Sequence, residues 1–180
     1  MTSSMARLKV GKLTWVVRAV IYKLFFWNMR NVLYLGKPTF FYNIKNVIFG
    51  KRFRIYPHAR VELSNAASCE FGDNTAIGDN FHLICQSKIL IGNDFLCSSN
   101  VFISDTDHSF QLSSVPFINQ PCVTKDVHIG NNVFLGKNVV ILAGTKLGDN
   151  TIVAANAVVR GNHPDNVVLA GVPAKIIRVL

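Results

Sequence analysis

An apolar residue returns at every sixth position between residues 129 and 159. These positions are Ile129, Leu135, Ile141, Leu147, Val153 and Val159. Four residues after each of the first five apolar positions comes a small or β-branched residue, namely Val133, Val139, Thr145, Thr151 and Ala157. A period of six fits neither an α-helix nor the simple alternation of one strand. It indicates a solenoid of hexapeptides, in which each unit is a short strand and a turn.

The same period governs an earlier part of the chain. Its apolar positions are Phe71, Ile77 and Leu83, and then, after two extra residues (Ile89 and Leu90), Ile91, Cys97 and Ile103. Three hexapeptides make one coil of a triangular prism, so we predict an all-β solenoid over residues 71–164. The sixfold phase is lost after His108 and resumes at Ile129, which predicts an excursion loop over 109–127. This loop carries apolar residues (Phe110, Leu112, Val115, Phe117 and Ile118), and we expect a neighbouring subunit to cover it.

The flanking segments lack the clear repeat. Residues 1–36 are expected to form a basic amphipathic helix, and residues 37–70 irregular first coils. Residues 165–180 are expected to form a strand and a tail. The helix could cap the open end of the solenoid or lie on an anionic membrane, and the two roles are compatible. Its apolar stretch is too short to span a bilayer and contains Arg18 and Lys23.

Charge is distributed unevenly along the 180 residues. The formal net charge is +9, yet residues 1–61 hold all of this excess, with twelve Lys or Arg and no Asp or Glu. No nucleic-acid recognition motif accompanies these cations, so nucleic acid is not an expected partner. The four cysteines show no CxxC spacing, which favours reduced thiols in a cytoplasmic protein. Peripheral contact with the inner face of the cytoplasmic membrane remains open.

The hexapeptides, the segment 103–108 (ISDTDH), the long loop and the tail 170–178 (AGVPAKIIR) occur in a fixed order. Together they resemble the hexapeptide-repeat O-acetyltransferases, a family that includes maltose, galactoside and serine acetyltransferases. The resemblance covers about residues 70–180 and is greatest to enzymes that acetylate sugars of bacterial surface polysaccharides. It implies a left-handed parallel β-helix, a homotrimer, acetyl-CoA as the acetyl donor and a sugar or lipid-linked glycan as the acceptor.

Acyl transfer to a sugar hydroxyl needs a base, and a neutral imidazole suits this role. His108 lies on the last rung before the loop, and the resemblance makes it the expected general base for direct transfer. Asp105 or Asp107 could accept the other imidazole N–H and set the tautomer, with Asp105 preferred. Asp107 could instead contact the substrate. All three could also be ordinary residues of a polar turn.

The resemblance also suggests where acetyl-CoA binds. The thioester is expected near Gly136 and Lys137, where a backbone N–H could stabilise the oxyanion. Small residues at Gly136, Ala154 and Ala155 could line the pantetheine groove. Lys175 and Arg178 match tail positions close to the nucleotide phosphates. Two departures occur: Arg160-Gly161 stands where the family often has Thr-Lys, and Phe134 replaces a tryptophan.

Three other interpretations remain open at this stage. Asn80 and His82 are candidates for sugar contact. A metal site formed by His82, His108 and His128, as in archaeal-type carbonic anhydrases, would need a different histidine spacing, so no metal is expected. The chain could also be a non-catalytic scaffold or sugar-binding protein, or an N-acyltransferase that acts on nucleotide sugars.

Overall fold

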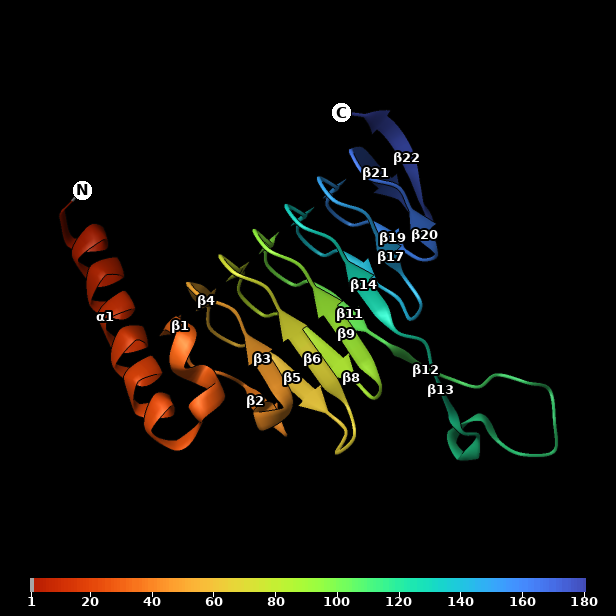
Figure 1. Cartoon of the computed structure of the whole chain (residues 1–180), viewed down its shortest axis with the longest axis horizontal. Coiled ribbons are helices and arrows are strands. Elements are labelled where there is room, and N and C mark those ends of the chain that lie inside the picture. Colours follow the sequence, from red (N-terminus) through yellow and green to blue (C-terminus); the bar gives the residue numbers. More distant parts are fainter. Residues whose placement is uncertain (1) are drawn as a thin grey trace.

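The computed structural model describes residues 2–180, with side chains described from Gly11 onward. Most of the chain winds into stacked triangular coils, with a helix at one end and a loop projecting from one side (Figure 1). Strands of successive coils pair in parallel, so each side of the prism is a continuous sheet. We call these sheets faces 1, 2 and 3, in the order in which the chain visits them.

Face 1 contains β1 Val32–Leu35, β4 Phe53–Ile55, β7 Ala76–Ile77, β10 Leu96–Cys97, β15 Phe134–Leu135, β18 Ile152–Val153, β21 Val167–Gly171 and the antiparallel β22 Ala174–Val179. Face 2 contains β2 Phe40–Tyr42, β5 Arg60–Leu63, β8 His82–Cys85, β11 Phe102–Ser104, β16 Val140–Ile141 and β19 Val158–Val159. Face 3 contains β3 Val47–Phe49, β6 Ser68–Phe71, β9 Lys88–Ile91, β14 Val127–Ile129, β17 Lys146–Leu147 and β20 Asn162–His163.

The repeat positions form the core of the prism. All six apolar residues at the sixfold positions between 129 and 159 are at most 4% exposed. The small residues that follow them are equally buried, because they lie where the chain bends and the three faces meet. The fold prediction, a left-handed parallel β-helix of hexapeptide repeats with an N-terminal helix and a projecting loop, is therefore confirmed.

Asparagines stabilise the corner between faces 1 and 2. Asn80, Asn100, Asn138 and Asn156 all have positive φ, a conformation that asparagine tolerates better than most residues. The side-chain amides of the first three each donate to the next asparagine along the stack, over 2.8–3.0 Å. The ladder fixes the stacking register of the coils at this corner.

The first coils are more regular than the sequence indicates. Within the segment 37–70, β2 pairs with β5 and β3 with β6, and both pairs continue in register into the hexapeptide coils. Aromatic side chains fill this end of the core: Phe53 lies 4.7 Å from Phe49 and 5.2 Å from Phe71, measured between ring centroids.

Helix α1 (Thr2–Phe25) covers the open N-terminal end of the prism (Figure 1). A short 3₁₀ helix, η1 (Trp27–Asn31), then leads into β1. Ala19 is buried, Trp15 packs against Tyr34 and Tyr56, and an Arg18 guanidinium N–H donates to the Leu35 carbonyl over 2.9 Å. These contacts give α1 the capping role. No helix in the described part of the chain is both long enough and apolar enough to cross a membrane.

Two further 3₁₀ turns complete the structure. η2 (Ile44–Asn46) connects β2 to β3, and η3 (Phe117–Asn119) lies within the projecting loop. The loop is closed by Gln120, which is buried and donates to the carbonyls of Gln111 and Val115. The loop's apolar side chains, by contrast, are exposed in the single chain.

Candidate active site

His108 lies where the chain leaves the prism at the corner between faces 2 and 3. After β11, the chain forms β12 (Thr106–His108), enters the loop and returns as β13 (Cys122–Thr124). The two strands pair antiparallel and form a two-stranded arm at the base of the loop (Figure 1). Because the arm is a ladder, it holds His108 at a fixed position outside the coils.

A cavity of about 340 Å³ opens beside this arm. Its walls come from the arm, from the start of the loop and from the same corner in the two following coils. The lining residues are Asp107, His108, Ser109, Phe110, Gln111, Val123, Lys125, Leu142, Ala143 and Arg160. The cavity therefore combines an imidazole with two cations, one carboxylate and several apolar side chains, a composition that fits an anionic or polar ligand with an apolar part.

The imidazole of His108 faces Cys122 across the arm. Its Nδ1 lies 3.8 Å from the Cys122 sulfur, and these two residues are cross-strand partners. The tautomer that donates from Nδ1 to sulfur leaves Nε2 unprotonated and able to act as a base. The Asp107 carboxylate accepts the backbone N–H of His108 over 2.8 Å, so its recorded bond is to the backbone.

Asp105 has hydrogen-bond partners other than the imidazole. This residue is fully buried, and its carboxylate oxygens accept the backbone N–H groups of Gln86 and Ser87 over 2.8 and 2.7 Å. The Cys85 thiol lies 3.4 Å from the same carboxylate. These bonds tie β11 to the corner of the preceding coil. The hydrogen bonds of the Asp105 carboxylate are therefore to the corner that carries the arm, and they favour a positioning role for this residue.

The expected thioester region lies at a different corner. Gly136 and Lys137 follow β15, and Ala154 and Ala155 follow β18, so all four belong to the corner between faces 1 and 2. They do lie together: a Cβ added at Gly136 would lie only 2.6 Å from the backbone nitrogen of Ala155. Within one chain, however, the width of face 2 separates this corner from His108.

Arg160 connects the His108 cavity to the C-terminal tail. It lines that cavity and also a second, open groove formed with Asn162, His163, Pro173, Ala174, Lys175 and Ile176. Lys175 is the second cation of this groove. Arg178 lies further along β22, where it pairs with Val168 of β21. The structure thus brings Arg160 and Lys175 together in one groove. Arg178 lies on the same β21–β22 hairpin as Lys175.

The two residues expected to contact sugar have other partners in the chain. Asn80 belongs to the asparagine ladder described above. The His82 ring lies on face 2, where Nε2 is 3.1 Å from a Glu62 carboxylate oxygen. Arg60 also bonds to this carboxylate and holds its pKa below the ordinary value. His128 lies on face 3, so the chain distributes His82, His108 and His128 over separate parts of its surface.

Sequence reasoning missed Lys125, Leu142 and Ala143, which line the His108 cavity. Lys125 is held there by its backbone, which bonds to the Asp105 carbonyl and to the Gly144 N–H. It is the single basic residue of the predicted loop 109–127, and this was the only sequence signal for its role. Leu142 and Ala143 occupy the corner positions of the next coil, directly after the buried Ile141.

Comparisons with known proteins agree with this architecture. The model of the bacterial transferase hexapeptide family (six repeats) matches residues 126–161. The lipopolysaccharide biosynthesis O-acetyl transferase WbbJ of Escherichia coli (strain K12) is 36% identical over 83% of this chain and 80% of its own length. The galactoside O-acetyltransferase of the same strain is 35% identical over 60% of this chain and 55% of its own length.

Solved structures of acyltransferases also share the architecture of this chain. A galactoside acetyltransferase in complex with coenzyme A superposes with a TM-score of 0.64 at 25% identity, over 94% of this chain and 82% of that chain. AntD, an N-acyltransferase from Bacillus cereus, superposes with a TM-score of 0.76 at 20% identity, over 90% and 87% of the two chains, which shows a shared fold. The protein described here belongs to the hexapeptide-repeat acetyltransferases.

Proposed function

We propose that this protein transfers an acetyl group from acetyl-CoA to a sugar hydroxyl during assembly of a bacterial surface polysaccharide. The observation that carries the proposal is the cavity that places His108 beside Lys125 and Arg160. Its relatives support the acceptor class, since WbbJ is named for lipopolysaccharide biosynthesis and WcaF, 28% identical over 93% of this chain, for colanic acid biosynthesis.

The chemistry assigned to His108 is general-base catalysis of direct transfer. Nε2 removes the proton from the acceptor hydroxyl as its oxygen attacks the thioester carbonyl carbon. The carbon–sulfur bond then breaks, and the imidazolium returns the proton to the departing CoA sulfur. This role requires the tautomer that carries its proton on Nδ1, the nitrogen that lies 3.8 Å from the Cys122 sulfur. These reaction steps need neither an acyl-enzyme intermediate nor a metal ion.

The groove from the His108 cavity to the tail suits the nucleotide end of CoA. Arg160 and Lys175 supply positive charge where phosphates would lie, with Arg178 further along the same hairpin. Lys125 adds a cation close to His108, where it could stabilise an anionic acceptor or the developing oxyanion.

A homotrimer would join the two corners that one chain keeps apart. The His108 corner and the Gly136 corner border opposite edges of face 2. Three copies that turn face 2 toward a common axis would bring the Gly136 corner of one copy to the His108 corner of the next. Face 2 has an outward apolar row suited to such burial, because the half-buried Phe102, Val140 and Val158 lie in register.

The test compares His108→Ala with the matched variant His58→Ala. His58 is an exposed histidine of another corner, paired with Asp79, so its loss leaves the cavity intact. We expect His108→Ala to lower kcat at least about a hundredfold, because general-base catalysis typically contributes this much. CoA binding by calorimetry and trimer mass by sedimentation should not change. Near-normal turnover in His108→Ala would refute the assignment.

The acceptor is tested with matched sugars that carry either a hydroxyl or an amine at the reacting position. Mass spectrometry should detect an added acetyl on the hydroxyl sugar. Acetylation of the amine sugar alone would identify an N-acyltransferase that acts on nucleotide sugars. A chain that binds neither acetyl-CoA nor CoA at millimolar concentration would instead be a scaffold or a sugar-binding protein.

A further inference from the structure

Helix α1 covers the prism with one side and leaves a broad apolar surface on the other. The side chains on the outer side are between 43% and 79% exposed, and they extend into η1: Leu13, Val16, Val17, Val20, Ile21, Leu24, Phe25 and Trp27. A contiguous apolar surface of this kind is unusual for a protein surface in contact with water, and it marks a site of interaction.

The apolar surface continues from the helix into the first coil. A groove of about 500 Å³ lies between α1 and β2, and its walls include Ile21, Phe25, Phe26, Phe40, Phe41 and Ile44. Together with the outer side of α1, these residues form what we call the terminal apolar surface. It lies at the end of the prism, separated from the projecting loop by several coils (Figure 1).

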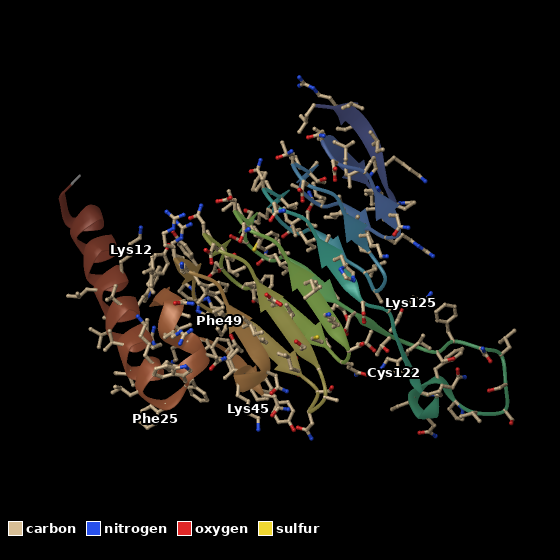
Figure 2. All side chains as sticks on the ribbon, in the orientation of Figure 1. Lys12, Phe25, Lys45, Phe49, Cys122 and Lys125 are labelled. Atoms are coloured by element: carbon tan, nitrogen blue, oxygen red, sulfur yellow. The ribbon has the colours of Figure 1, made fainter. Side chains whose placement is uncertain are left out.

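Cations surround the terminal apolar surface without carboxylate partners. The ion pairs among residues 11–180 are His58–Asp79, Arg60–Glu62 and His82–Glu62. No carboxylate in this range therefore neutralises Lys12, Lys23 or Arg30. Figure 2 shows Lys12 and Phe25 toward opposite ends of α1, with Lys45 on the neighbouring coil. The Arg30 guanidinium lies 5.3 Å from the Trp27 ring, so a cation and an exposed aromatic side chain are adjacent.

We propose that the terminal apolar surface binds the headgroup layer of an anionic phospholipid membrane. The charge decides between a membrane and a second copy of the chain. Residues 1–61 contain twelve cations and no acidic residue, so two such ends would repel each other. An anionic bilayer attracts these cations and receives the apolar side chains, as amphipathic interfacial helices do. This surface is independent of the proposed acyl transfer.

The first test uses the two tryptophans as separate reporters. Trp27 is 78% exposed on the terminal apolar surface, whereas Trp15 packs against Tyr34 and Tyr56. In Trp15→Phe, the emission of Trp27 should shift to the blue with vesicles of phosphatidylglycerol and phosphatidylcholine and should be quenched by brominated acyl chains. In Trp27→Phe, the emission of Trp15 should not be quenched. An unchanged Trp27 emission, or equal quenching of both residues, would overturn the proposal.

The second test compares vesicle flotation of two double variants. Leu24→Ser with Phe25→Ser removes exposed apolar side chains of α1. Leu112→Ser with Ile118→Ser removes apolar side chains of the projecting loop that are even more exposed, and serves as the control. We expect the first variant to bind at least about tenfold more weakly, since each side chain buries apolar area in the membrane. The control should bind as the unmodified protein does, and equal losses in both variants would contradict the proposal.

Lipid composition, salt and protein concentration distinguish the remaining explanations. Binding should need phosphatidylglycerol and weaken as salt is raised, because the screening length falls from about 10 Å at 0.1 M to about 3 Å at 1 M. Equal binding to vesicles of phosphatidylcholine alone would show that the cations do not contribute, and it would overturn the proposal of an anionic membrane. A blue shift of Trp27 emission that grows with protein concentration without lipid would identify a second copy as the occupant and overturn the proposal.

Discussion

Replacing Asp105 with alanine should destabilise the fold more than any other single change at the active-site corner. The carboxylate accepts two backbone N–H groups, from Gln86 and Ser87, at 2.8 and 2.7 Å in a fully buried position. Alanine would leave both donors without a partner, and each buried unsatisfied group costs about 1–3 kcal/mol. We therefore expect the free energy of unfolding to fall by about 2–6 kcal/mol.

Urea unfolding followed by circular dichroism measures this loss, with Asp107→Ala as the matched control. Asp107 is exposed and its carboxylate accepts a single N–H, that of His108, so its replacement should change stability by less than about 1 kcal/mol. Asp105→Asn keeps the shape of the side chain but presents an amide donor to one of the two N–H groups. Its free energy of unfolding should therefore fall by an amount between those of Asp107→Ala and Asp105→Ala.

Kinetics decide between the positioning role and the role expected from the sequence. If Asp105 oriented the imidazole directly, Asp105→Ala would lower kcat while the free energy of unfolding stayed unchanged. If Asp105 positions the corner, Asp105→Ala lowers the free energy of unfolding. Turnover then falls as well, because the corner that anchors the arm is no longer held in place. An Asp105→Ala protein with unaltered stability and greatly reduced kcat would refute the reasoning.

Three further predictions concern other parts of the chain. Gly136→Ala should destabilise the protein by about 1–3 kcal/mol in thermal unfolding, because the added Cβ would meet the backbone of Ala155; Gly11→Ala, which meets nothing, should not. Maleimide should label the exposed Cys122 alone in the native protein and all four cysteines after unfolding, since burial raises the pKa of the other thiols, that of Cys97 to about 12. Arg60 lowers the pKa of Glu62, so the ionised carboxylate stabilises the fold at neutral pH, and this stabilisation is lost as the pH falls through the lowered pKa. Glu62→Gln should lower the free energy of unfolding by at most about 1 kcal/mol at pH 7 and should make that free energy depend less on pH in the acid range.

The hexapeptide coils could be predicted because their spacing has a direct physical consequence. A large residue at every sixth position can be buried only if the chain turns at regular intervals, and Ile129, Leu135 and Ile141 lie in the core as expected. The loss of phase after His108 likewise predicted that an excursion interrupts the coils, although the chain leaves the prism slightly earlier, because β12 (Thr106–His108) already belongs to the arm. Both features are local in sequence, so no knowledge of distant contacts was needed.

The parts that could not be predicted depend on contacts between coils. The Asp105 carboxylate bonds to a corner of the preceding coil, and a polar turn in the sequence does not reveal that partner. Lys125 reaches the cavity only because its backbone bonds to Asp105 and Gly144. In the first coils, the aromatic contacts of Phe49 and Phe53 fill the core while corners of irregular length conceal the period.

The position of α1 relative to His108 limits which acceptors the enzyme could use at a membrane. Three strand spacings separate β1, against which α1 packs, from β10 in the coil that leads to His108, and each spacing is about 4.8 Å. With a helix diameter of about 10 Å, the reacting hydroxyl would stand about 25 Å above the headgroups. A first sugar joined directly to a lipid would not reach this height, whereas an outer sugar of a longer lipid-linked glycan would. We therefore expect acetylation of vesicle-bound glycans to rise steeply with their length, while soluble glycans of the same lengths should react equally. Equal rates for short and long vesicle-bound acceptors would contradict this orientation of the protein on the membrane.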